Sequence, residues 1–290
     1  MASYKPGLPY VLYTASLCTI AVVAFSTMGL AGQQAGLPPQ IGATNKLITV
    51  RPAPSTPGQP RLGPGEKPAA MSAGQSERGS SADLPDGPAI PVLGYGSWHG
   101  VPGTVEPLHS DLVTTFSIEV EDGVHLVDGD ARFGEFVENV LEDPRSWGGD
   151  GEVMLQRVEH NAPDLRIRLA SQTTARRLCG FELPFDTSCR IDDRVYLSAA
   201  RWVRGAKSFG QNLDEYRQYM VNHEVGHFLG HGHVPCSAEG GLAPVMMQQT
   251  FSTNNDELAH ITTATPQQVI VPADGRACTP NSWPYPRAGR

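Results

Sequence analysis

The chain has 290 residues, a formal net charge of −8 and 40% hydrophobic residues. Such an acidic chain is not expected to bind nucleic acid, which requires a basic face. Its 31 glycines and 25 prolines, with only 18% charged residues, indicate that part of the chain does not pack into a folded domain. The length still leaves room for one ordinary domain.

The N-terminal segment is apolar. Residues 6–45 contain no charged side chain, and residues 8–30 are mostly apolar. About 20 apolar residues suffice for a helix to cross a bilayer, so we expect residues 1–31 to be a membrane anchor. A cleaved signal peptide is the alternative, because residues 29–31 could serve as a small-residue cleavage site. Lys5 favours an internal N-terminus, which leaves the rest of the chain outside the cell membrane, or secreted after cleavage.

Residues 32–91 are rich in proline, glycine and serine and show little apolar periodicity. Such a segment cannot bury enough apolar surface to offset the entropy lost on ordering. We therefore expect residues 32–91 to be a disordered linker. It would hold a domain formed by residues 92–286 away from the membrane.

The expected domain contains both strands and helices. In the first strand Phe116, Ile118 and Val120 alternate with more polar residues. A helical spacing of apolar residues follows, and a second helix begins at Asn212 with Glu215 as a capping-box partner. The predicted strands are 112–120, 153–158, 165–169 and 194–197, and the first helix is 130–141. This order predicts a mixed sheet domain of the α+β class.

The second helix contains the motif H-E-x-x-H-x-x-G-x-x-H. His223 and His227 are four residues apart, so they lie on one helical face, one turn apart. Gly230 permits the left-handed turn that ends a helix, which lets His233 return as a third ligand. Neutral imidazoles in this arrangement are typical zinc ligands. We therefore predict one catalytic Zn²⁺ held by these three histidines.

Glu224, beside the first ligand, is the predicted catalytic residue. Three protein ligands leave one zinc position for water, whose pKa zinc lowers towards about 7. Glu224 is placed to take the proton of this water and to hand it to the leaving amine. His231 lies two residues short of the expected ligand spacing, so we expect it at the rim of the site or behind the ligands.

The extended zinc motif followed by Met246 and Met247 resembles the metzincin peptidases. The resemblance implies a twisted mixed sheet with an N-terminal helix, an active-site helix and a small C-terminal subdomain with a methionine turn. It also implies that one methionine forms an apolar floor under the zinc. Met246 follows an aliphatic residue and fits that pattern better than Met247; two ordinary core methionines are the alternative. No tyrosine follows the turn, so we expect no tyrosine ligand.

The chain is also similar to an exported actinobacterial family long catalogued as a domain of unknown function. The similarity covers about residues 94–285. It is carried by residues 194–202, 216–219, 221–233, 243–250 and 278–285. This resemblance implies a metzincin-type fold and a surface location, with no established substrate.

The five cysteines fall into two groups. Cys18 lies in the apolar N-terminal segment, where we expect it to fill apolar space. The other four would lie outside the cytoplasm, where disulfides persist, and they allow three pairings. We favour Cys179–Cys189 and Cys236–Cys278. A zinc thiolate site is the alternative, but no C-x-x-C spacing supports it.

Calcium is a second metal ion to consider, with weaker support in the sequence than zinc. Residues 121–123 and 128–130 pair acidic side chains with glycine. Such isolated pairs are more often turns than cation sites, so we do not expect a calcium ion.

Together these features predict a zinc metalloendopeptidase that cleaves protein or peptide substrates and acts as a monomer. One alternative is a zinc hydrolase of cell-wall amide bonds. Another is a non-catalytic surface binding module with a structural zinc. Glu224 argues against the binding module, because a closed structural site has four protein ligands and needs no carboxylate beside them.

Overall fold

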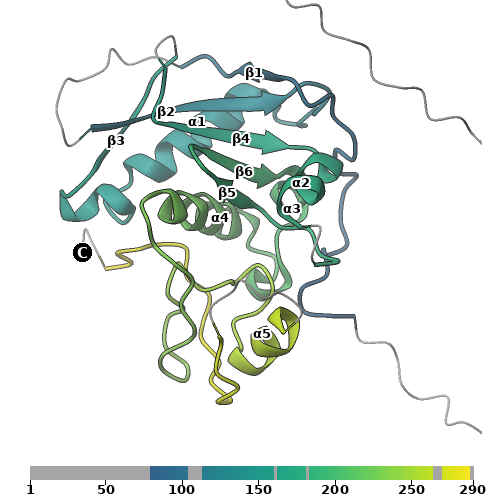
Figure 1. Cartoon of the computed structure of the whole chain (residues 1–290), viewed down its shortest axis with the longest axis vertical. Helices are drawn as coiled ribbons and strands as arrows, with labels where there is room; N and C mark the ends of the chain where they lie inside the picture. Colours follow the sequence, from purple (N-terminus) through teal and green to yellow (C-terminus); the bar gives the residue numbers. More distant parts are fainter. Residues whose placement is uncertain (1–78, 104–112, 160–161, 181–182, 264–269, 288–290) are drawn as a thin grey trace, which may run out of the picture. The chain divides into compact units, whose positions relative to one another are not determined.

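The computed structural model describes residues 79–103, 113–159, 162–180, 183–263 and 270–287. These residues build a mixed six-stranded sheet, which remains open, and helices that pack against it (Figure 1). The domain is therefore of the predicted α+β class. The expected anchor, residues 1–31, lies outside the described residues. Within the part of the chain that the structure describes, no helix is long and apolar enough to span a membrane.

The sheet has the strand order β1-β2-β4-β6-β5, and β3 also pairs with β2. The strands are β1 Trp98–Gly100, β2 Val113–Glu121, β3 Met154–Arg157, β4 Leu165–Ala170, β5 Cys189–Ile191 and β6 Arg194–Ser198. Strands β3, β2, β4 and β6 pair in parallel, whereas β1 and β5 are antiparallel to their neighbours. All four predicted strands are present, and β5 ends the sheet on the side of the histidine motif.

Alternation along the central strands sets which face of the sheet is buried. Phe116, Ile118 and Val120 of β2 are almost completely buried, as their spacing of two predicts. Leu165, Ile167 and Leu169 of β4 and Val195 and Leu197 of β6 continue the same apolar layer. The main core lies between this face and the helices.

Two helices supply most of the other side of that core, α1 Gly129–Glu142 and α4 Leu213–Phe228 (Figure 1). The first was predicted from apolar spacing and the second from its capping box at Asn212. Asn212 caps α4, because its Oδ1 accepts a hydrogen bond from the backbone N–H of Glu215 at 3.3 Å. The shorter helices are η1 Trp147–Asp150, α2 Gln172–Cys179, α3 Ala199–Arg204, η2 Lys207–Phe209 and α5 Asn255–Thr262.

The chain after α4 forms a smaller lobe that contains α5 (Figure 1). It has its own apolar cluster, which includes Met247, Phe251 and Leu258. The predicted disulfide Cys236–Cys278 lies in this cluster and joins the segment after the histidine motif to the C-terminal tail. The lobe therefore holds the third histidine against the end of α4.

Residues 79–91, which the composition assigns to the linker, lie against the domain. Ala82 is fully buried in the cluster of the smaller lobe. The guanidinium of Arg201 on α3 donates hydrogen bonds to the carbonyl oxygens of Ala82 and Asp83. The folded domain therefore begins upstream of residue 92.

Candidate metal centre

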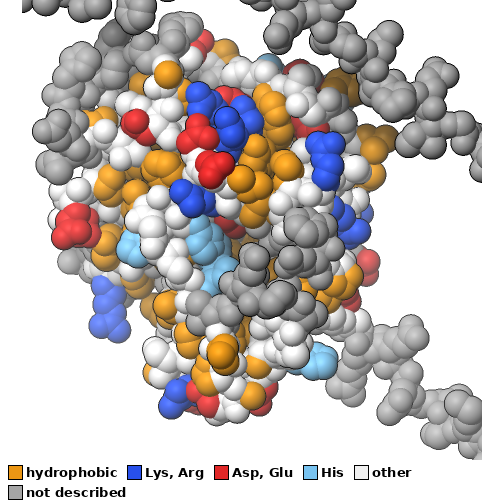
Figure 2. Space-filling model, in the orientation of Figure 1, with side chains coloured by type: hydrophobic (Ala, Val, Ile, Leu, Met, Phe, Trp, Pro, Cys, Tyr) orange, Lys and Arg blue, Asp and Glu red, His pale blue; other side chains and the backbone are white. Residues whose placement is uncertain are grey.

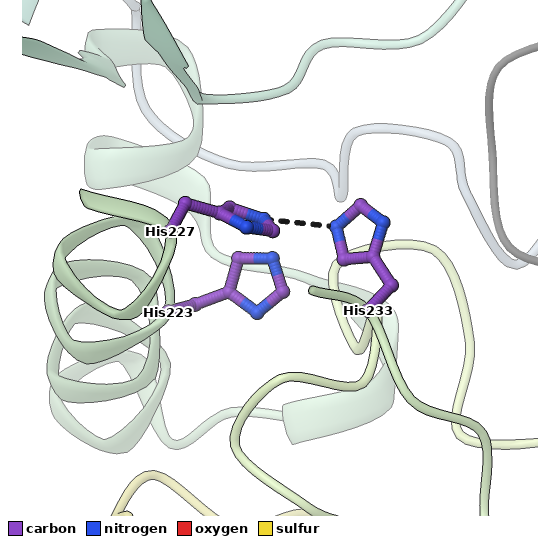
Figure 3. Close-up of side chains that lie close together, drawn as sticks. All are labelled: His223, His227 and His233. Carbon is purple, nitrogen blue, oxygen red and sulfur yellow. Dashed lines mark hydrogen bonds between the residues drawn. The ribbon is translucent and has the colours of Figure 1, made fainter. Parts of the chain in front are cut away.

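Helix α4 and the turn after it bring three histidines together. His223 and His227 project from one face of α4, and His233 faces them from the following segment (Figure 3). Gly230 has φ +94°, a left-handed conformation that glycine adopts without strain. The turn there reverses the chain. One ring nitrogen from each histidine lies within 4.8 Å of the others.

Two backbone carbonyls fix how the rings of α4 are oriented. The Nδ1–H of His223 donates to the carbonyl oxygen of Val245 at 2.9 Å, and that of His227 donates to the carbonyl oxygen of His231, also at 2.9 Å. These bonds leave the Nε2 lone pairs free to bind a cation. The Nε2 atoms of His227 and His233 are 3.0 Å apart (dashed line in Figure 3).

The surroundings keep the three rings neutral. Burial, with the other two histidines as further causes, lowers the pKa of His223 well below its usual range. Burial also lowers the pKa of His233 to about 3 and shifts that of His227 downward. Neutral imidazole is the form that binds a metal ion. The centre therefore disfavours protonation of the three imidazoles and suits a metal ion that prefers nitrogen ligands.

Glu224 is buried beside the ligands without a partner for one of its oxygens. Its side chain is only 5% exposed, and Oε2 has no hydrogen-bond partner among the described residues. Burial raises the pKa of its carboxyl group to about 8. The residue lines a cavity of about 320 Å³ together with the three histidines. A buried carboxyl oxygen without a hydrogen-bond partner is costly, which indicates a role in that cavity.

Beneath the ligands the packing is close. A Cβ atom at Gly226, the residue before His227, would overlap Sδ of Met246 and lie 2.6 Å from Cζ2 of Trp147. Met247 is instead fully buried in the cluster of the smaller lobe. Of the two methionine side chains, that of Met246 packs against α4 at Gly226, whereas Met247 contacts α4 through its carbonyl oxygen, which accepts a hydrogen bond from Tyr219.

His231 lies at the rim of the centre. Its ring is stacked on Trp147, with the ring centroids 4.4 Å apart and the planes 13° from parallel. Its ring nitrogens are outside the group formed by His223, His227 and His233. Only its carbonyl oxygen contributes, through the hydrogen bond from His227.

Several residues around the centre carry no sequence motif. Trp147 donates its Nε1–H to the carbonyl oxygen of Asn222 at 2.8 Å. The buried side chain of Asn222 bonds Ser146 and the carbonyl oxygen of Ser282. The one sequence feature that could have indicated these contacts is Asn222 itself, a polar residue on the inward side of α4. These contacts anchor the turn of helix that carries His223.

The structure also shows the positions of the disulfide near the cavity and of the acidic residues considered for calcium. Cys179–Cys189 forms as predicted, and both cysteines line the cavity. One acidic residue of each segment considered for calcium bonds a histidine: Asp122 bonds Nδ1 of His99 at 2.7 Å, and Asp130 bonds Nε2 at 3.0 Å. Among the described residues, the three histidines of the motif form the one cluster suited to a metal ion.

Comparisons with known proteins place the chain in a family. No curated protein matches it. A sequence profile described as "Protein of unknown function (DUF3152)" matches residues 84–286, which is well over half of the chain and includes the whole histidine centre. The chain therefore belongs to the DUF3152 family of proteins of unknown function.

Proposed function

We propose that this protein is a zinc-dependent metallopeptidase that resembles the metzincins and acts outside the cytoplasm. The observation that carries the proposal is Glu224. A structural zinc site has no use for a buried carboxyl group with an unpaired oxygen. Next to three ligand histidines and a cavity, the same carboxylate is suited to proton transfer.

The donor set fits zinc. All three donors are imidazole nitrogens, which zinc accepts at about 2.0–2.1 Å, and two of the rings are oriented by backbone carbonyls. Three protein ligands are typical of catalytic rather than structural zinc sites. When bound, zinc would act as a Lewis acid on the scissile carbonyl and activate water for attack.

The protein groups then have distinct tasks. His223, His227 and His233 would hold the ion, and the carbonyl oxygens of Val245 and His231 keep two of the rings in the ligating tautomer. Glu224 would accept a proton from the attacking water and deliver it to the nitrogen of the leaving amine.

The cavity also offers a place for an extended peptide. Strand β5 ends the described sheet, so one edge of its backbone has no neighbouring strand there. Cys189 of β5 lines the cavity beside the histidines. A peptide that adds to this edge as a further strand would pass over the centre.

Two features support a location outside the cytoplasm. The domain contains two disulfides, which persist in oxidising compartments. The apolar residues 8–30 favour an anchor or a signal peptide. We propose that the domain is held at the outer face of the cell membrane, or secreted if the segment is cleaved.

The experiment compares two glutamates of α4 in the full chain. Glu224→Gln keeps the shape of the side chain but cannot accept the proton. We expect peptide hydrolysis to fall by about 10²–10⁴-fold while the zinc content stays normal. Glu215→Gln is the matched control, because Glu215 is exposed at the start of the same helix. It should leave both quantities unchanged.

Equal turnover of wild type and Glu224→Gln would contradict this mechanism. If neither hydrolyses any peptide although zinc is bound, the peptidase proposal fails. Assays with cell-wall amides would then separate an amide hydrolase from a binding module.

A further inference from the structure

One basic residue lies in the cavity with the histidines. Arg190, the middle residue of β5, lines the cavity together with His223, His227, His233 and Glu224. Figure 2 shows basic and histidine side chains side by side on this face. Among the described lining residues, Arg190 is the one with a permanent positive charge and Glu224 the one carboxylate.

The register of the sheet explains why Arg190 points towards the centre. Arg190 lies opposite Val195 in the antiparallel pair of β5 and β6. Residues opposite each other share a face of the sheet, and the side chain of Val195 is fully buried on the face that α4 covers. Because β5 is the last strand, the longer Arg190 side chain reaches past the core into the cavity, where it is exposed.

The guanidinium of Arg190 lines the cavity without a charged partner among the described residues. No carboxylate among the described residues forms an ion pair with Arg190, in contrast to Arg166, Arg168 and Arg176 of the same domain. Its guanidinium donors are therefore available to a ligand that enters the cavity.

We infer that Arg190 binds a carboxylate of the substrate, so that the site prefers acidic peptides. The inference rests on the proposed peptidase function and names its substrate class. Guanidinium and carboxylate match in a bidentate arrangement that also fixes orientation. The carboxylate could belong to an Asp or Glu side chain or to the C-terminus of the peptide, and the same arginine would recognise either.

The experiment measures binding and cleavage separately. Short fluorescent peptides that carry Glu or Gln at one position, each with a free or an amidated C-terminus, are titrated against the full chain with Glu224→Gln. We expect the acidic peptides to bind at least about 10-fold more tightly than their neutral partners, as for a hydrogen bond to a charged group. The Glu/Gln pairs and the acid/amide pairs show which carboxylate is recognised.

Two further variants in the same background identify the residue. Arg190→Gln should abolish the preference, and Arg190→Glu should reverse it in favour of lysine peptides. Arg194→Gln is the matched control, because Arg194 is on the neighbouring strand, is paired with Asp193 at 3.5 Å and lies outside the cavity lining. It should keep the preference. High salt should weaken the preference, because the site is open to solvent.

Equal affinity for acidic and neutral peptides, no binding of any acidic peptide, or a preference that survives Arg190→Gln would overturn the inference. An equal loss of cleavage for all peptides in Arg190→Gln with Glu224 restored would also overturn it, since that result marks a general effect on the reaction. Cleavage by the wild type tests the peptidase function itself. Carboxylate-dependent binding without any cleavage would therefore reject the function and keep the ligand class.

Discussion

The Nδ1 atom of His223 lies 2.9 Å from the carbonyl oxygen of Val245, the residue that precedes Met246. This hydrogen bond joins α4 to the segment predicted as a methionine turn. A second contact reinforces the junction, because Sδ of Met246 occupies the space beside Gly226. These two contacts fix the distance between α4 and the turn. A substitution on either side should therefore disturb the positions of the three histidines.

Gly226→Ala tests that spacing. The added methyl group would overlap Met246 and press on Trp147, and forcing an extra carbon into such packing typically costs about 1–3 kcal/mol. We expect the free energy of unfolding to fall by that amount and zinc to bind more weakly. Urea denaturation and a zinc titration measure the two effects.

The matched control is Gly232→Ala in the same motif. A Cβ atom there meets nothing within 4 Å, and Gly232 has no positive φ. This variant should unfold at the same urea concentration as the wild type. If Gly226→Ala behaves like Gly232→Ala, the packing described under the ligands is wrong.

The sequence was informative where spacing decides geometry. The interval of four residues places His223 and His227 on one face of α4, and Gly230 marks the turn before His233. Strand β2 was also predictable, because its inward residues Phe116, Ile118 and Val120 alternate with less buried ones. In these cases the periodicity of the backbone is itself the signal.

The rest of the site depends on contacts that leave no pattern. The carbonyl oxygens of Val245 and His231 orient two ligands, but every residue has a carbonyl. Strand β5 has only three residues, too few for an alternation to show which way Arg190 points. Arg176 on α2 pairs with the buried Asp186 at 2.7 Å, a contact that no sequence pattern predicts. Tertiary pairing decides each of these positions.

The hydrogen bonds of Arg201 indicate where the folded domain begins. Its side chain is fully buried, and its guanidinium donates only to backbone carbonyls among the described residues. Those carbonyls belong to Ala82, Asp83, Asp186 and Gly205. Removing the first two leaves a buried charge under-bonded, and each hydrogen bond to a charged group contributes about 1.5–3 kcal/mol.

Three fragments, residues 79–290, 84–290 and 92–290, test this boundary by urea denaturation. We expect the free energy of unfolding to fall by at least about 2 kcal/mol from the first to the second. The step from the second to the third should be smaller, because the hydrogen bonds lost there, from the half-buried Arg204 to Pro88 and from the backbone N–H of Gln172 to Pro91, involve no fully buried charge. Superimposable curves for the first two fragments would show that residues 79–83 do not stabilise the domain.

His99 predicts a pH dependence of stability. Its hydrogen bonds to Asp130 and then Asp122 raise its pKa above the usual 6.5. A raised pKa stabilises the folded state fully below the unfolded value, and this contribution is lost as the pH rises through the folded pKa. His99→Gln should therefore cost more below pH 6.5 than above pH 8. Because the ring is half exposed, we expect a difference of no more than about 0.5 kcal/mol.

Urea denaturation of the wild type and His99→Gln across this pH range measures the difference. A cost that grows with rising pH would contradict the assigned direction of the shift. Asp122→Asn should remove part of the same dependence, because Asp122 is one of the two carboxylates that bond the ring.

His231 and His233, which both follow Gly230, should differ in how much zinc their removal costs. His233 offers a nitrogen to the group of three, whereas the ring of His231 is stacked on Trp147. Two protein ligands hold zinc far more weakly than three, so we expect His233→Ala to lose most of its zinc. His231→Ala should keep nearly all of it, because the carbonyl oxygen that bonds His227 belongs to the backbone and is retained. Elemental analysis of both variants, purified side by side at equal zinc, gives the two stoichiometries. Full zinc in His233→Ala, or an equal loss of zinc in His231→Ala, would show that His233 is not the third ligand. The role proposed for Gly230, the turn that returns His233 to the centre, would then be wrong as well.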